Sequence, residues 1–158
     1  AGGTFSSRLY REVREKRGLA YSVGTSLIWL DHAALFAGST ATRADRAHET
    51  LKVITSELQR LAQDGPTQQE LDEAKSYLKG SQMLALDSST KLAAQLVRFL
   101  FDRLGIDYID KRAAIIDAVT LDDAKRLAKR ILSGGLLVST VGPTPEKVSD
   151  KATPKNNP

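Results

Sequence analysis

The sequence predicts an α+β fold, in which a small, mainly antiparallel sheet packs against about six helices. Apolar residues recur with a period of two only over residues 20–40, as in two neighbouring strands. Helical spacing of apolar residues then fills most of residues 42–132, and one short apolar run follows at 136–141. A hairpin followed much later by a third strand is typical of α+β folds rather than of alternating strands and helices.

The size and composition of the chain limit the class of protein. Its 158 residues fit one ordinary domain. The 23 Lys and Arg and the 19 Asp and Glu are interspersed, so the net charge of +4 favours solubility over commitment to a polyanion. The absence of Cys excludes disulfides, thiolate metal sites and a Cys nucleophile. Every apolar run is far shorter than the ~20 residues of a membrane span.

The first predicted element is a short helix with the densest charge in the chain. Ser6 and Ser7 are suitable N-caps, and the helix is predicted to run to about Arg17 and to stop at Gly18. Acidic residues separate its basic ones, which favours a solvated face with ion pairs such as Glu12 with Lys16. Binding of nucleic acid by this face is a remote alternative, because no aromatic stacking platform accompanies the charge.

A hairpin is predicted next, with strands over residues 20–30 and 33–40 and a turn at Asp31-His32. Its first strand is expected to place alternate residues on one face. These residues are Tyr21, Val23, Thr25, Leu27 and Trp29.

Five more helices are predicted from apolar spacing and from their caps. The first opens at Thr42 and ends at residues 64–66, and a Thr67/Glu70 capping box starts the second, which continues to about Leu86. The third contains Leu92, Leu96 and Leu100 and is expected to end at Gly105. The last two are expected to be capped by Asp107 and by Thr120 with Asp123. The run 136–141 is predicted to be a buried strand, and residues 144–158 a flexible polar tail.

The histidines, serines and glycines of this sequence do not form a known metal-binding, hydrolase or phosphate-binding motif. His32 and His48 lack the spacing of a zinc motif, and no Gly-x-Ser-x-Gly elbow or phosphate loop occurs. The residues therefore predict no metal site and no bound cofactor in this chain.

Residues 2–23 read GGTFSSRLYREVREKRGLAYSV. This stretch resembles the insulinase/pitrilysin/mitochondrial processing peptidase family of zinc metallopeptidases, at its second, zinc-free homologous domain. Landmarks at residues 66–75, 79–80, 118–123 and 138–142 also look like those of the family. The resemblance implies that residues 1–143 are part of the C-terminal, substrate-side domain of such a peptidase. The family domain begins with a further strand and helix, so the chain is expected to be an N-terminally truncated fragment.

The resemblance assigns roles to two residues. In peptidase members of the family, an inverted zinc motif lies on one domain or subunit, and an Arg/Tyr pair of the companion domain reaches the substrate. Arg14 and Tyr21 match that pair by position and are the expected catalytic residues. Since the chain reverses at Gly18, both side chains are expected to meet at one sheet edge. The alternatives are a Glu-paired Arg14 and an ordinary strand aromatic at Tyr21.

The implied function is therefore to bind extended peptides and to assist the transition state of a zinc-dependent peptidase. Zinc is expected in a companion domain or subunit, and the isolated chain is not expected to be active. Expected partners are that zinc-bearing domain and a peptide substrate, without nucleic acid, and the uncovered sheet edge gives the fragment a route to self-association. The alternative is a non-catalytic structural subunit of the same fold. The style of the family points to a bacterial protein, periplasmic or cytoplasmic.

Overall fold

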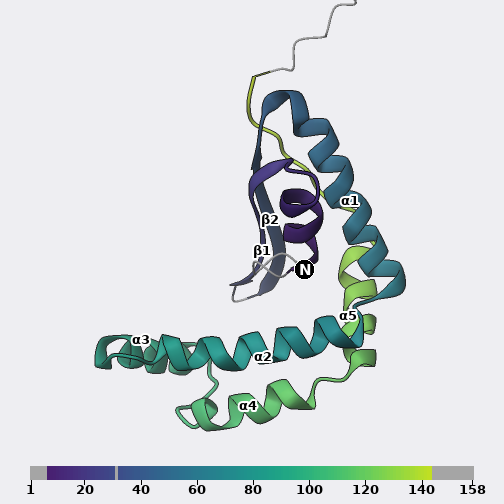
Figure 1. Ribbon diagram of the computed structural model, residues 1–158. Helices are drawn as coiled ribbons and strands as arrows, with labels where there is room; N and C mark the ends of the chain where they lie inside the picture. Colours follow the sequence, from purple (N-terminus) through teal and green to yellow (C-terminus); the bar gives the residue numbers. More distant parts are fainter. Residues whose placement is uncertain (1–6, 31, 144–158) are drawn as a thin grey trace, which may run out of the picture. The chain divides into compact units, whose positions relative to one another are not determined.

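The computed structural model describes residues 7–30 and 32–143 (Figure 1). The chain divides into two compact units. The hairpin unit contains the residues up to Leu58 and those from Gly135 onward, and the helical unit contains Gln59–Gly134.

The hairpin unit is built on two antiparallel strands, β1 (Ala20–Leu30) and β2 (Ala33–Thr42). The short helix η1 (Tyr10–Glu15) packs against β1 (Figure 1). The predicted helix and hairpin are confirmed, and the predicted capping residue Ser7 accepts a hydrogen bond from the Tyr10 backbone N–H at 3.4 Å. Ser6 and Asp31 lie outside the described residues.

The core of the hairpin unit lies between η1 and β1. Its apolar side chains are almost wholly excluded from solvent, so their burial fixes how η1 lies on the strand. They are Leu9, Val13, Leu19, Ala20 and Val23.

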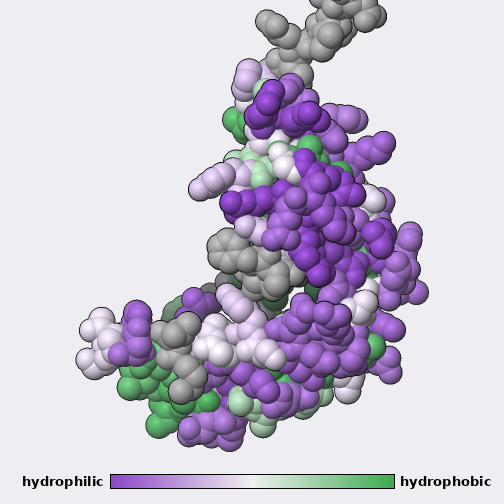
Figure 2. Space-filling model, viewed as in Figure 1, coloured by the Kyte–Doolittle hydropathy of each residue, from purple (hydrophilic) through white to green (hydrophobic). Residues whose placement is uncertain are grey.

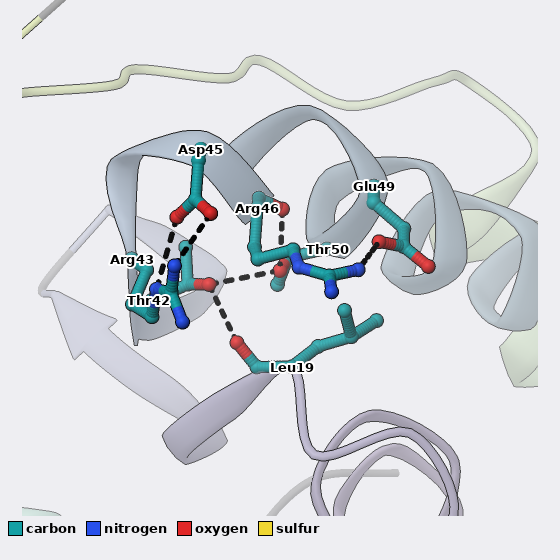
Figure 3. Close-up of polar contacts among 7 residues, drawn as sticks. All are labelled: Leu19, Thr42, Arg43, Asp45, Arg46, Glu49 and Thr50. Carbon is teal, nitrogen blue, oxygen red and sulfur yellow. Dashed lines mark hydrogen bonds and ion pairs between the residues drawn. The ribbon is translucent and has the colours of Figure 1, made fainter. Parts of the chain in front are cut away.

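The long helix α1 (Ala47–Asp64) follows β2 through a single 3₁₀ turn, η2 (Ala44–Arg46). The predicted helix start at Thr42 is therefore several residues too early, because α1 begins at Ala47. Thr42 is the last residue of β2, and its hydroxyl donates to the Leu19 carbonyl at 2.5 Å rather than capping a helix (Figure 3).

Two threonine hydroxyls join α1 and β2 to the segment that precedes β1 (Figure 3). The Thr50 hydroxyl, whose residue is 1 % exposed, lies 3.0 Å from that of Thr42 and 2.9 Å from the Arg46 carbonyl. The Thr42 hydroxyl donates its hydrogen to the Leu19 carbonyl, so the single Thr50 hydrogen is shared between the Arg46 carbonyl and the Thr42 oxygen. These contacts connect β2 and α1 to the segment that precedes β1. We call Leu19, Thr42 and Thr50 the threonine latch.

We expect Thr42→Val to destabilise the hairpin unit by about 1–3 kcal/mol, because the Leu19 carbonyl then loses its hydroxyl partner. Thr42→Ser keeps the hydroxyl and is the matched control. Urea unfolding followed by circular dichroism measures both, and equal stability of the Val variant and the wild type would contradict the role of the latch.

The helical unit contains the end of α1 and four further helices. These are α2 (Gln68–Ala85), α3 (Ser89–Phe101), α4 (Tyr108–Ala118) and α5 (Leu121–Leu132). Two predicted capping boxes are confirmed. Thr67 with Glu70 starts α2, and Thr120 with Asp123 starts α5, each with reciprocal side-chain to backbone hydrogen bonds.

Two predictions for α3 and α4 need correction. Asp107 precedes α4 as predicted, but its carboxylate pairs with the Lys111 side chain instead of capping the helix. Helix α3 ends at Phe101 rather than near Gly105. Arg103 takes the left-handed conformation, with a φ of 58°, and the Leu104 N–H bonds the Phe99 carbonyl at 2.8 Å. Glycine is the usual residue at such a helix ending, so an arginine at this position does not predict it.

Polar bonds and one aromatic contact join α4 to its neighbours in the helical unit. Lys79 of α2 pairs with Asp117 of α4 at 2.7 Å, and Arg112 donates to the Leu78 carbonyl at 2.8 Å. The buried Phe99 ring meets that of Tyr108 edge to face at 5.0 Å. A hydrophobic area lies over α3 and the loop leading to α4 (Figure 2). Its exposed residues include Val97, Leu100, Phe101, Leu104 and Ile106.

The predicted strand over residues 136–141 does not form. This segment has no regular structure, and the Leu137 and Val141 side chains are fully exposed. A strand requires a neighbour for its N–H and C=O groups, and the sheet of the described residues contains only β1 and β2. The sheet is therefore two-stranded. The predicted tail, residues 144–158, lies outside the described residues.

Candidate functional site

The two predicted site residues lie together. The Arg14 guanidinium carbon is 5.2 Å from the centroid of the Tyr21 ring and 5.0 Å from that of the Tyr10 ring. Both distances are within the range of cation–π attraction. We call Arg14, Tyr10 and Tyr21 the Arg–Tyr cluster.

Arg14 projects from an irregular helix. Residues 10–15 form a π-helix, shown by the Lys16 N–H bonding the Arg11 carbonyl five residues earlier at 2.9 Å. Such helices are rare and frequently occur at functional sites. The chain then reverses as predicted, because Gly18 adopts a φ of 59° and its N–H bonds the Arg14 carbonyl at 2.9 Å.

Tyr21 occupies a β-bulge. Ala20 pairs with Thr42 and Ser22 pairs with Ala41, so Tyr21 is an extra residue of β1 between two consecutive residues of β2. The predicted simple alternation is therefore wrong at Tyr21. Ala20 and Val23, three residues apart, are both buried, whereas Tyr21 is 82 % exposed. Bulges re-aim side chains and are common next to active sites.

The chemistry available to the Arg–Tyr cluster is hydrogen-bond donation. Arg14 carries five N–H donors and a permanent charge, and Tyr21 carries a phenol that is open to solvent. A cation and an O–H donor at one place are suited to an oxygen that is, or becomes, negatively charged.

The acidic residue Glu12 of η1 is paired with cations other than Arg14. Glu12 forms ion pairs of 2.6 Å with Lys16 and with Arg17, as predicted for Lys16. Hydrogen bonds from Lys16 and Arg17 lower the pKa of the Glu12 carboxyl below its ordinary value of 4.5.

A carboxyl whose pKa is lowered by folding stabilises the fold above its unfolded pKa and loses that effect as the pH falls through the folded value. We therefore expect the wild type to melt at a higher temperature than Glu12→Gln at pH 7, and the gap to close as the pH falls below 4.5. Thermal melts across this pH range measure the gap. A gap that stays constant down to strong acid would contradict the assignment.

Metal ligands are not gathered in the part of the chain that the structure describes. Over residues 7–30 and 32–143, no three His, Asp or Glu side chains lie close enough together to hold an ion. His32 and His48 are both exposed. These residues therefore do not fit a zinc site, and no reaction step is assigned to a metal bound here. The described helices include none that is long and apolar enough to cross a membrane.

Comparison with known families identifies the domain that carries the Arg–Tyr cluster. Residues 2–78 match the model of the peptidase M16 inactive domain. The chain belongs to the peptidase M16 family, as part of its inactive domain. This confirms the resemblance seen in residues 2–23. The α+β fold, with its small antiparallel sheet and several helices, agrees with this family.

Relatives of this M16 chain carry different names. A protein of Streptomyces coelicolor named an uncharacterized zinc protease is 33% identical over 150 residues, which cover 95% of this chain and 33% of the relative. A protein of Helicobacter pylori named a non-peptidase homolog is 35% identical over 83 residues, covering 52% of this chain and 19% of the relative. The chain thus spans about a third or less of the length of these relatives.

A solved structure supports the M16 fold directly. The crystal structure of a peptidase M16 inactive domain from Pseudomonas fluorescens aligns with a TM-score of 0.73 and 32% identity, covering 83% of this chain and 31% of that chain.

Sequence reasoning missed one member of the Arg–Tyr cluster. Tyr10 precedes Arg14 by four residues, the spacing at which side chains on a helix are neighbours. The spacing of Tyr10 and Arg14 therefore predicts that the aromatic ring lies beside the expected catalytic arginine.

Proposed function

We propose that this chain is the substrate-side part of a zinc-dependent peptidase and that Arg14 and Tyr21 contact the peptide. The observation that carries the proposal is their placement. A cation and an exposed phenol lie 5.2 Å apart, on a π-helix and a β-bulge. Two irregular backbone features at two adjacent polar side chains are more typical of a binding site than of a solvated surface.

In this proposal Arg14 donates N–H bonds to a backbone carbonyl of the bound peptide and so fixes its register. Tyr21 donates its O–H to the carbonyl oxygen at which negative charge develops during hydrolysis. Both groups act as donors and neither transfers a proton. The zinc belongs to a companion domain or subunit, which supplies the metal-bound water.

The bound peptide is expected to be extended. Tyr21 lies on a strand of a two-stranded sheet, and an extended peptide beside this strand presents one carbonyl every ~3.3 Å. Recognition through backbone carbonyls tolerates many side chains, so we expect broad sequence preference.

A non-catalytic role is the second candidate function. The name of the Helicobacter pylori relative, a non-peptidase homolog, supports this second candidate. In a purely structural subunit the Arg–Tyr cluster would serve packing alone, and loss of the Tyr21 hydroxyl would have no effect on peptide hydrolysis.

The test uses the intact protein together with its zinc-bearing domain or subunit. Cleavage of an unstructured peptide is measured for the wild type, Arg14→Ala and Tyr21→Phe. Lower turnover in both variants, with unchanged thermal melts, supports the proposal. Unchanged turnover in both would remove Arg14 and Tyr21 from the reaction and favour the structural role.

A further inference from the structure

The side chain of Arg14 has an aromatic neighbour for which neither the family resemblance nor the proposed reaction gives a role. We infer that Tyr10 is a positioning residue, which holds the Arg14 guanidinium by its ring face. This inference rests on the proposed function and deepens it, because it says how the arginine of the Arg–Tyr cluster is kept in place.

The contact is short enough to hold the side chain. The Arg14 guanidinium carbon lies over the Tyr10 ring, 5.0 Å from its centroid, closer than to the Tyr21 ring. The face of an aromatic ring attracts a cation because its π electrons carry partial negative charge. Both residues are half-buried, so the attraction is less weakened by water than at a fully exposed pair.

The two rings differ in how firmly they are held. Tyr21 is 82 % exposed and lies on a bulge, where the ladder of the sheet is interrupted. Tyr10 lies between Leu9 and Val13 on a helix anchored by those two residues, which are 2 % and 0 % exposed. A ring on the anchored helix therefore restricts the arginine side chain better than one on the exposed bulge.

An aromatic neighbour also preserves the chemistry of the Arg14 guanidinium. The ring carries no carboxylate oxygens that would occupy the N–H donors of arginine, so these donors stay available to a peptide carbonyl. A carboxylate partner would occupy the same donors. An aromatic residue is therefore suited to orient a substrate-binding arginine without competing with the substrate.

The experiment separates the ring from the hydroxyl at position 10 in the intact protein with its zinc-bearing partner. We expect Tyr10→Leu to lower kcat/KM by about 3- to 30-fold, the range that a partly buried cation–π contact supports. Tyr10→Phe keeps the ring, so its kcat/KM is expected to stay within about threefold of the wild-type value. Tyr77→Leu, at a half-exposed tyrosine of α2, is the matched control.

A double-mutant cycle shows whether Tyr10 acts through Arg14. In the Arg14→Ala background, Tyr10→Leu is expected to cause no further loss. An equal loss in both backgrounds would overturn the inference, since it would mean a general effect on folding. Arg14→Ala with full activity would instead contradict the proposed function itself, so the two failures are distinguishable.

A spectroscopic measurement tests the contact without relying on turnover. In the intact protein with labelled arginine, ring currents shift the side-chain NMR resonances of Arg14. We expect Tyr10→Phe to retain this shift and Tyr10→Leu to lose the part that the Tyr10 ring causes, while the Tyr21 ring still contributes its own part. Unchanged Arg14 resonances in Tyr10→Leu would overturn the inference, even if the variant is less active.

Discussion

We expect Arg14→Ala to lower kcat/KM for an extended peptide by about 100-fold, because a peptide whose register is no longer fixed is misplaced relative to the reacting groups. Arg14 lies against two tyrosine rings, so its loss removes a positive charge and also the group that faces Tyr21. Initial rates of cleavage by the intact protein with its zinc-bearing partner provide the measurement.

The variant Arg14→Lys separates the effect of the positive charge from the effect of the planar guanidinium. Lysine keeps the charge but lacks the planar fork that donates two parallel hydrogen bonds, so we expect it to restore only a minor part of the activity. The matched control is Arg43→Ala, which removes an exposed arginine of the same unit that pairs with Asp45. Full activity of Arg14→Ala, or equal losses in the Arg14 and Arg43 variants, would count against a specific role for Arg14.

Tyr21→Phe removes a single oxygen and leaves the ring beside Arg14 in place. Its expected loss therefore appears in kcat more than in KM, because the O–H is proposed to bond an oxygen that becomes charged only in the transition state. A rise in KM with constant kcat would mean that Tyr21 binds the substrate and does not assist the reaction.

The second large effect concerns stability. We expect Leu9→Ala to destabilise the hairpin unit by about 2–5 kcal/mol, because Leu9 is 2 % exposed and its truncation leaves a cavity between η1 and β1. Such a loss is a large part of the 5–15 kcal/mol that usually keeps a domain folded. Urea unfolding followed by circular dichroism measures it.

Leu9→Met is the control for Leu9→Ala, since it keeps the volume of the side chain and is expected to cost less than about 1.5 kcal/mol. Leu9 also supports the helix that carries Arg14. We therefore expect the Ala variant to lose activity at temperatures below its own unfolding midpoint. Equal stability of the Ala and Met variants would show that η1 is held by other contacts.

Local signals in the sequence were enough to predict the elements of the hairpin unit. The strand predicted over residues 20–30 has the bounds of β1, although its alternation is wrong at Tyr21, and Gly18 is the left-handed residue at which the chain turns. The nearness of Arg14 and Tyr21 followed from that turn. Capping boxes were equally readable, since they need only two residues three apart, as at Thr120 and Asp123.

Features that depend on a second segment were not predictable in this way. The bulge at Tyr21 depends on the register with β2, and the threonine latch joins residues up to 31 positions apart in sequence, from Leu19 to Thr50. The segment 136–141 is apolar enough to form a buried strand. A strand also requires a neighbour for its backbone hydrogen bonds, and the composition of the segment does not predict whether that neighbour is present.

The far end of the hairpin has a practical consequence. The chain has a single tryptophan, Trp29, which lies next to the turn between β1 and β2 and is 67 % exposed. The tryptophan emission of the chain therefore reports on this one position, and we expect its wavelength to be that of an indole exposed to water. A partner that covers this end of the hairpin would shield Trp29 from water and shift its emission to shorter wavelength. Assembly can therefore be followed by intrinsic fluorescence, without an attached dye.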